Sequence, residues 1–107
     1  MAEEILVVLS TFPDVEMARR IAEKLVTQNL AACANITAQV ESIYRWQGKI
    51  DSATEALAVF KLTANRYAVF EKALRALHPY EVPEIIALPV THGSKEYLRW
   101  VCENCAG

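Results

Sequence analysis

The order of apolar segments predicts an α+β fold in which four antiparallel strands carry helices on one face of the sheet. Two continuous aliphatic runs, at residues 5–9 and 84–90, have the length and composition of strands in the centre of a sheet. Two other segments repeat apolar residues every three or four positions, which is typical of amphipathic helices. At 107 residues, the chain is expected to form a single domain over residues 1–107.

The first half of the chain predicts a strand, a helix and a long hairpin. Thr11, Pro13 and Asp14 are typical of a helix start after the first strand. Residues 31–46 then alternate, which predicts an extended segment, and residues 47–49 form a turn before a return strand at about 54–62. Such a hairpin is too long to lie over the core of one small chain, so its far end must project or pair with something else.

The second half predicts a helix, a strand and a further helix. Residues 65–77 carry the second apolar stripe, and Pro79 disfavours helix in the residue before it. After the second aliphatic run, Gly93 and Ser94 are expected to cap a short last helix. The order strand, helix, strand, strand, helix, strand is the ferredoxin-like, or split βαβ, arrangement, here with an extra C-terminal helix.

The composition favours an assembled protein with little affinity for nucleic acid or membrane. Hydrophobic residues make up 53% of the chain, more than so small a domain can bury, which suggests that another subunit covers part of its surface. The net charge is −2, and no basic run is present. Glu3 and Glu4 do not fit a signal peptide, and the longest apolar run is too short to span a bilayer, so we expect a cytoplasmic protein. An odd number of cysteines, three, argues for reduced thiols.

Several motifs occur in one order along nearly the whole chain. They are TFPD at residues 11–14, LAACANI at 30–36, SIYRWQGKI at 42–50, HPYEVPE at 78–84 and LPVTHG at 88–93, followed by Tyr97, Leu98 and Trp100. Together they resemble the divalent-cation-tolerance (CutA) family. The resemblance implies a ferredoxin-like subunit in a homotrimer whose long hairpins cross to neighbouring subunits. It also implies a non-enzymatic role in tolerance of divalent metals, copper in particular, and a trimer similar to the PII signalling proteins.

The resemblance also shows where this chain differs from its relatives. Some members of the family carry cysteine where Ser10 stands and histidine where Leu77 stands. A copper site built from those two positions is therefore not expected here.

Three residues are candidate ligands for copper or another divalent cation, and folding is expected to need no metal. Cys33 is the family's cysteine and a soft ligand suited to Cu(I), while His78 and His92 are the only histidines. Each has a structural alternative: Cys33 as a small buried side chain, His78 as a cation at a helix end, and His92 as a turn residue. The pair Cys102 and Cys105 lies in the last turn of the chain, where packing is the better explanation than zinc or redox chemistry.

A second group of residues predicts a pocket between subunits. Its members are large aromatic residues with a lysine and a carboxylate as polar groups: Trp46, Lys61, Tyr80, Glu84, Tyr97 and Trp100. We expect the best pocket to lie between subunits and to be lined by Tyr80 and Glu84. A lysine among aromatic walls would suit a small polar or anionic ligand. The alternative is that these aromatic residues form the core of the subunit interface.

No catalytic motif accompanies these residues. An acylphosphatase-type enzyme would share the fold but needs an arginine- and glycine-rich phosphate cradle after the first strand, and residues 10–14 contain neither residue. No phosphate loop, paired-histidine motif or serine–histidine–acid set is present. The remaining alternatives are a metal-binding tolerance protein and a trimeric small-molecule sensor or scaffold.

Overall fold

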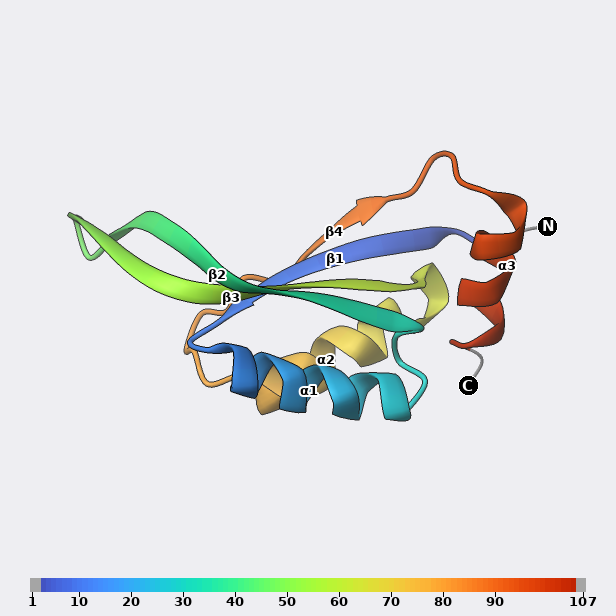
Figure 1. Ribbon diagram of the computed structural model, residues 1–107, viewed down its shortest axis with the longest axis horizontal. Coiled ribbons are helices and arrows are strands. Elements are labelled where there is room, and N and C mark those ends of the chain that lie inside the picture. Colours follow the sequence, from blue (N-terminus) through green and yellow to red (C-terminus); the bar gives the residue numbers. More distant parts are fainter. Residues whose placement is uncertain (1–2, 106–107) are drawn as a thin grey trace.

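In the computed structural model, which describes residues 3–105, a four-stranded antiparallel sheet carries two helices on one face (Figure 1). The elements are β1 (Ile5–Phe12), α1 (Val15–Thr27), β2 (Cys33–Trp46), β3 (Lys49–Thr63), a short 3-10 helix (Ala64–Arg66), α2 (Tyr67–Leu77), β4 (Ile86–Pro89) and α3 (Lys95–Glu103). The strand order is β2-β3-β1-β4, and every neighbouring pair is antiparallel. The predicted ferredoxin-like arrangement with an extra C-terminal helix is confirmed.

The core lies between the sheet and the helices α1 and α2. β1 pairs with β3 at eight consecutive positions, from Ile5 opposite Thr63 to Phe12 opposite Ala56. Alternate side chains of both strands point to the helices, and the largest of them are fully buried: Val8, Phe12, Phe60 and Leu62 from the strands, with Leu25, Phe70 and Leu74 from the helices. The rings of Phe60 and Phe70 meet edge to face with centroids 5.1 Å apart, an arrangement that aromatic pairs prefer.

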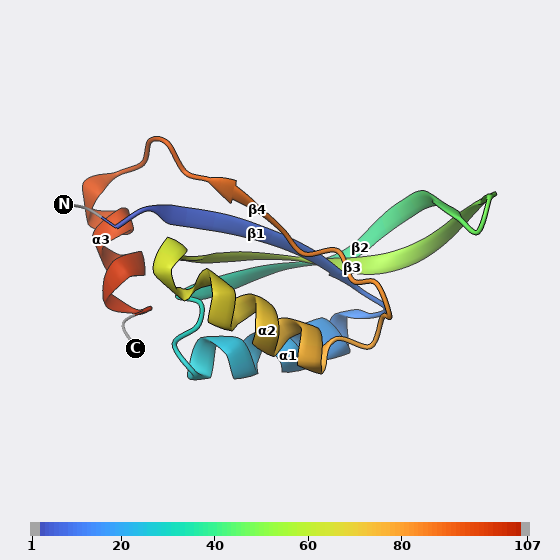
Figure 2. The ribbon, with the colours of Figure 1, turned by 180° about the vertical axis from the view of Figure 1, so that it is seen from behind.

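The other face of the sheet is also apolar, but neither α1 nor α2 covers it (Figures 1 and 2). The register places these side chains on the face away from the helices: Val7 and Leu9 of β1, Leu57 and Val59 of β3, and Ile86 and Leu88 of β4. We call this surface the open face. Ile86 and Leu88 each remain 51% exposed. Exposed apolar area of this kind commonly marks an interface.

The prediction of a central strand at residues 84–90 was wrong in its place and length. β4 covers only Ile86–Pro89 and lies at the edge of the sheet, where it pairs with β1 alone. All four of its residues are exposed. A continuous aliphatic run predicts burial on both faces, but it does not reveal whether the same chain supplies the cover.

The predicted long hairpin is confirmed, and it extends beyond the rest of the molecule (Figure 1). β2 and β3 contain 14 and 15 residues, and the longest dimension of the structure is 47 Å against 25 and 23 Å for the others. Gln47 and Gly48 make the turn with φ of 51° and 80°, the left-handed values that a two-residue hairpin turn requires. A register shift between Thr37 and Val40 marks the place where the hairpin leaves the sheet.

Two helices begin at side-chain caps. Asp14 accepts a hydrogen bond of 2.8 Å from the backbone N–H of Met17 at the start of α1, and Ser94 accepts one of 3.1 Å from that of Tyr97 at the start of α3. Ser94 therefore caps the start of α3, as predicted. The hydroxyl of Thr11 does not cap α1, because Thr11 still belongs to β1.

We expect Leu74→Ala to lower the free energy of unfolding by about 2–5 kcal/mol, because it removes a fully buried side chain between α2 and the sheet. Val69→Ala is the matched control on the same helix, since Val69 is 52% exposed, and it should change stability by no more than about 0.5 kcal/mol. Denaturant titration followed by circular dichroism measures both. Equal losses in the two variants would contradict the described core.

Candidate functional site

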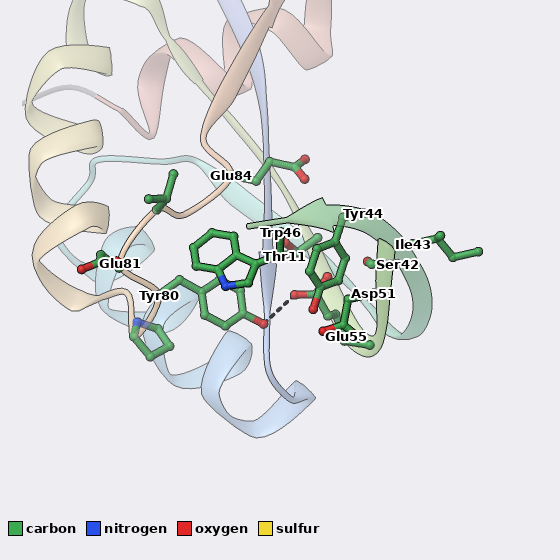
Figure 3. A pocket seen from close by; sticks show the side chains of 13 residues that line it. Thr11, Ser42, Ile43, Tyr44, Trp46, Asp51, Glu55, Tyr80, Glu81 and Glu84 are labelled. Atoms are coloured by element: carbon green, nitrogen blue, oxygen red, sulfur yellow. Dashed lines mark hydrogen bonds between the residues drawn. The ribbon is translucent and has the colours of Figure 1, made fainter. Parts of the chain in front are cut away.

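A pocket of about 830 Å³ lies between the projecting hairpin, from Glu55 at its base to Trp46 beside the turn, and the segment that follows α2 (Figure 3). Its walls come from β1, β2, β3 and that segment: Thr11, Ser42, Ile43, Tyr44, Trp46, Asp51, Ala53, Glu55, Pro79, Tyr80, Glu81, Val82 and Glu84. The volume is in the range of small-molecule sites. We call it the hairpin-base pocket.

The strand register explains why these residues share one wall. Ser42 is opposite Ala53, and Tyr44 is opposite Asp51, so their side chains leave the hairpin on the same side. The alternation along β3 places Asp51 and Glu55 on the same side as Leu57 of the open face. The hairpin-base pocket is therefore the polar continuation of the apolar open face.

A short hydrogen bond connects the two walls of the pocket. The hydroxyl of Tyr80 donates to Oε2 of Glu55 over 2.5 Å, and only 9% of Glu55 is exposed. Such charge-assisted bonds are shorter and stronger than neutral ones. The pKa of Tyr80 is raised above its ordinary value, first by burial and then by the hydrogen bond and charge of Glu55. Tyr80 therefore stays protonated and keeps donating at neutral pH.

His78 positions the segment that carries Tyr80. Its Nε2 lies 2.8 Å from the carbonyl oxygen of Thr11, to which it donates, and its Nδ1 accepts a 3.1 Å hydrogen bond from the backbone N–H of Tyr80. The ring stacks on Phe12 with centroids 4.6 Å apart. Burial lowers the pKa of His78, although the bond to Thr11 and the charge of Glu55 oppose this effect. Both ring nitrogens of the neutral imidazole are therefore engaged within the subunit.

A second cluster lies at the other end of the sheet, beside α3. Sγ of Cys33 is 3.5 Å from the hydroxyl of Tyr97, whose ring stacks with that of Trp100 at a centroid distance of 5.7 Å. Lys61 is opposite Cys33 in the sheet and bonds Oδ1 of Asn35. The contact with Cys33, followed by burial, raises the pKa of Tyr97 to about 12.

Within one subunit, the six residues that are predicted to line a pocket between subunits therefore fall into two groups. Trp46, Tyr80 and Glu84 line the hairpin-base pocket, whereas Lys61, Tyr97 and Trp100 belong to the cluster beside α3. Lys61 is opposite Val7 on β1, four residues before Thr11 of the pocket, which corresponds to about 13 Å along the strand.

The part of the hairpin-base pocket that one subunit supplies lacks the lysine of the predicted site, and a pocket between subunits for a small polar or anionic ligand stays a prediction. This lining includes four carboxylates, those of Asp51, Glu55, Glu81 and Glu84, and no lysine, arginine or histidine. Lys61, which was to supply the positive charge, lies in the other cluster. On the walls that one subunit supplies, an anion would therefore meet only like charges, which disfavour its binding.

Comparison with known proteins identifies the family. A family model described as CutA1 divalent ion tolerance protein matches residues 6–104. The chain belongs to this family. The divalent-cation tolerance protein CutA of Thermus thermophilus is 49% identical over 98 residues, which cover 92% of this chain and 95% of that protein. Its solved structure superimposes with a TM-score of 0.93 at 47% identity, covering 95% of this chain and 99% of that one.

Other CutA relatives are longer than this chain. The chloroplastic CutA protein of Arabidopsis thaliana is 41% identical over 96 residues, which are 90% of this chain but 53% of the relative. Its name places it in an organelle, so membership of the CutA family does not fix a compartment. Over residues 3–105 of this CutA chain, no helix is long and apolar enough to cross a membrane.

The three predicted metal ligands do not meet within one subunit. Cys33 contacts Tyr97, His78 is enclosed beside Thr11, and the exposed His92 lies with its Nδ1 3.1 Å from Oγ1 of Thr91. Across the described part of the chain, no three histidine, cysteine, aspartate or glutamate residues are grouped closely enough to hold a metal ion. These residues therefore do not fit a copper site built from a single CutA subunit. Of the remaining thiols, Cys105 is buried in the core, as packing predicts.

Sequence reasoning missed the residue at the centre of the pocket, Glu55. The segment around it reads as an apolar strand, in which one charged residue suggests only a side chain turned to solvent. The available signal was the presence of that single carboxylate among the otherwise uncharged residues of 53–60. A charge in a buried strand requires a partner, which is here the hydroxyl of Tyr80.

The lowered pKa of His78 predicts that acid destabilises the protein. The unfolded chain takes up this proton near pH 6.5, whereas the folded chain resists it until a lower pH. The free energy of unfolding should therefore be highest above about pH 6.5 and fall as the pH drops below that value.

Between pH 6.5 and the lower pKa of folded His78, His78→Gln should make the free energy of unfolding less dependent on pH. His92→Gln should leave this pH dependence unchanged. Denaturant titrations at a series of pH values provide the measurement. A slope that persists in His78→Gln and disappears in His92→Gln would reverse the assignment.

Proposed function

We propose that this protein is a non-enzymatic, homotrimeric divalent-cation-tolerance protein whose subunits associate through the open face and the projecting hairpins. The observation that carries this proposal is the apolar face that α1 and α2 leave uncovered. Burying one leucine or isoleucine contributes about 1.5–3 kcal/mol, so covering several of them on this face favours association strongly. The hairpin supports the same conclusion, because Ile43 and Ile50 near its tip are 70% and 62% exposed. The number three comes from the resemblance to CutA proteins.

Among residues 3–105, no hydrogen bond joins the hydroxyl of Thr11 or Ser42 in the pocket to a carboxylate or imidazole, which supports a non-enzymatic role. Thr11 and Ser42 supply hydroxyls to the hairpin-base pocket, but activation of a hydroxyl requires a general base within hydrogen-bond reach. His78 is the nearest imidazole along the chain to the pocket wall, and Thr11 and the Tyr80 backbone engage both of its nitrogens. In this proposal, the pocket binds a ligand and does not catalyse a reaction on it.

For the metal, we propose that Cys33 is the residue through which copper binds. A thiolate is a soft donor suited to Cu(I), and Cys33 is only half-buried. Its position opposite Lys61 places it on the same side of the sheet as the open face, where a neighbouring subunit would supply further ligands. His78 is the least suitable of the three candidates, since a metal would have to replace a hydrogen bond at one of its nitrogens.

The pocket favours a second candidate function, a small-molecule sensor or scaffold of the PII type. Its volume and the aromatic side chains of Tyr44, Trp46 and Tyr80 are features of ligand sites. This candidate is compatible with the same trimer. The two candidate functions require different residues: the sensor or scaffold requires those of the pocket, whereas the copper-binding protein requires Cys33.

The assembly is tested with two charge substitutions at equally exposed sites. Leu88 on the open face is 51% exposed and Val69 on α2 is 52% exposed, so an isolated subunit would tolerate lysine equally at either position. We expect the wild type and Val69→Lys to remain trimers on dilution. In the Leu88→Lys variant, the trimer should dissociate or lose much of its thermal stability, because the substitution places a charge in an interface. A folded wild-type monomer in light scattering would refute the proposed assembly.

The copper proposal is tested by titrating Cu(I) into the wild type and the variants Cys33→Ser and Cys102→Ser. Loss of the thiolate ligand should reduce affinity by at least about tenfold in Cys33→Ser and leave Cys102→Ser unchanged. Competition with a chromogenic chelator measures the affinities. Equal affinities in all three proteins would exclude Cys33 as the ligand.

A further inference from the structure

We infer that the hydrogen bond between Tyr80 and Glu55 is a conformational latch, which fixes the direction in which the hairpin projects from the sheet. We call residues 78–85, which join α2 to β4, the strap. The inference rests on the proposed association of subunits through their hairpins, and it adds the device that prepares the hairpin for association. It does not depend on the copper proposal, because Cys33 belongs to the cluster beside α3.

Glu55 stands at the point where the hairpin leaves the sheet. The ladder between β1 and β3 ends at the pair Phe12–Ala56, and Glu55 is the next residue of β3 toward the turn. On the other side, Glu55 is opposite Val40, directly after the register shift in β2. Between the pairs on either side of this shift, β2 has two residues and β3 has one, and an extra residue of this kind bends a strand. The pivot of the hairpin is therefore at Glu55.

Beyond this pivot, the hairpin is a ribbon of two strands that pair with each other from Val40–Glu55 to Trp46–Lys49. An isolated two-stranded hairpin is marginally stable, so contacts with the body of the subunit decide its direction. Apart from the sheet ladders, the hydrogen bond that joins residues 40–55 to the rest of residues 3–105 is that of Tyr80 to Glu55.

The strap presents Tyr80 to the pivot from a fixed position. Nε2 of His78 is 2.8 Å from the carbonyl oxygen of Thr11 near the end of β1, and the backbone N–H of Tyr80 donates to Nδ1 of His78. The rings of Phe12, His78 and Tyr80 follow one another, with successive centroid distances of 4.6 and 4.9 Å. Figure 3 shows the hydroxyl at the end of this series directed at Glu55.

The burial of Glu55 couples the hydrogen bond to the direction of the hairpin. Its side chain accepts from the Tyr80 hydroxyl over 2.5 Å, and only 9% of the residue is exposed. A buried carboxylate without its donor is unfavourable, and it regains hydration by returning to water. At the pivot, a turn of the hairpin away from the strap would provide that water. The hydrogen bond therefore favours one direction of the hairpin over the others.

The direction of the hairpin matters for the proposed assembly. Ile43 and Ile50 near the tip are exposed, and a neighbouring subunit can cover them only if the hairpin points toward it. When the competent conformation is populated for a fraction of the time, the apparent affinity falls by that fraction. The latch raises this fraction before subunits meet, so Tyr80 is a positioning residue for association.

Residual dipolar couplings of backbone N–H groups test the direction of the hairpin itself. They are compared in Leu88→Lys subunits with and without Tyr80→Phe, because the proposed assembly is removed from both. With the Tyr80 hydroxyl, the couplings of residues 40–55 should fit the same alignment as those of β1. Without it, they should average to smaller values, while the couplings and chemical shifts of β1 stay unchanged.

Sedimentation on serial dilution tests the effect on assembly, in the urea concentration at which the wild type dissociates reversibly. Tyr80→Phe should dissociate at a concentration about tenfold or more above that of the wild type, because a hydrogen bond to a charged group is lost. Glu55→Gln keeps an oxygen that accepts from Tyr80 and should lie between the two. Tyr67→Phe is the matched control, since it removes a tyrosine hydroxyl from α2, outside the strap and the hairpin, and should behave as the wild type does.

Three results would overturn the inference. One is a set of hairpin couplings that fits the alignment of β1 equally well without the Tyr80 hydroxyl. Another is equal dissociation of Tyr80→Phe and Tyr67→Phe. The last is a uniform change across β1 and the hairpin, which would make Tyr80 a residue that stabilises the whole fold. If the wild type is a monomer, the proposed assembly fails, and the couplings in the wild type and in Tyr80→Phe still decide whether the latch exists.

Discussion

The pairing of β1 with β3 determines which side of the sheet every other residue faces. Eight consecutive pairs, from Ile5–Thr63 to Phe12–Ala56, place Val8 and Phe60 against the helices and Val7 and Val59 on the open face. Because side chains alternate along a strand, a shift by one residue would exchange the two sets. The core, the open face and the position of Glu55 within the pocket therefore depend on one register.

The same register separates two kinds of chemistry. A soft thiol, Cys33, lies beside Tyr97 at one end of the sheet, whereas hard oxygen donors line the pocket between the hairpin and the segment after α2 at the other end. Ligands of different character are therefore expected at the two places. The two proposed functions, copper binding through Cys33 and ligand binding in the hairpin-base pocket, therefore use different residues.

Most of the fold could be predicted from the sequence, because its elements follow local rules. The apolar stripes of α1 and α2, the alternation in β2 and the turn at Gly48 each depend on residues close together in the chain. The edge position of β4 could not be predicted, since it depends on which strands pair and on which face the helices cover. An aliphatic run has the same composition whether a helix or another subunit covers it.

The candidate site was less predictable for the same reason. Tyr80, Glu84 and Trp46 were predicted to converge because each stands near the end of a strand, and the structure brings them to one pocket. Lys61 was predicted to join them in a cleft between subunits, and within one subunit its pairing with Val7 places it farther along the sheet. Two observations on charge require coordinates: the burial of Glu55, and the lack of a basic residue among the described residues that line its pocket.

The place of β1 in the sheet has a consequence for synthesis of the chain. β1 is made first, but its partners β3 and β4 follow only at residues 49–63 and 86–89. Ile5 and Thr63 are 58 positions apart, so at about 5–20 residues per second the ribosome needs about 3–12 s to supply the partner of Ile5. During that interval the aliphatic strand has neither neighbour. A nascent chain of this protein therefore exposes an aliphatic strand before it can close its own sheet.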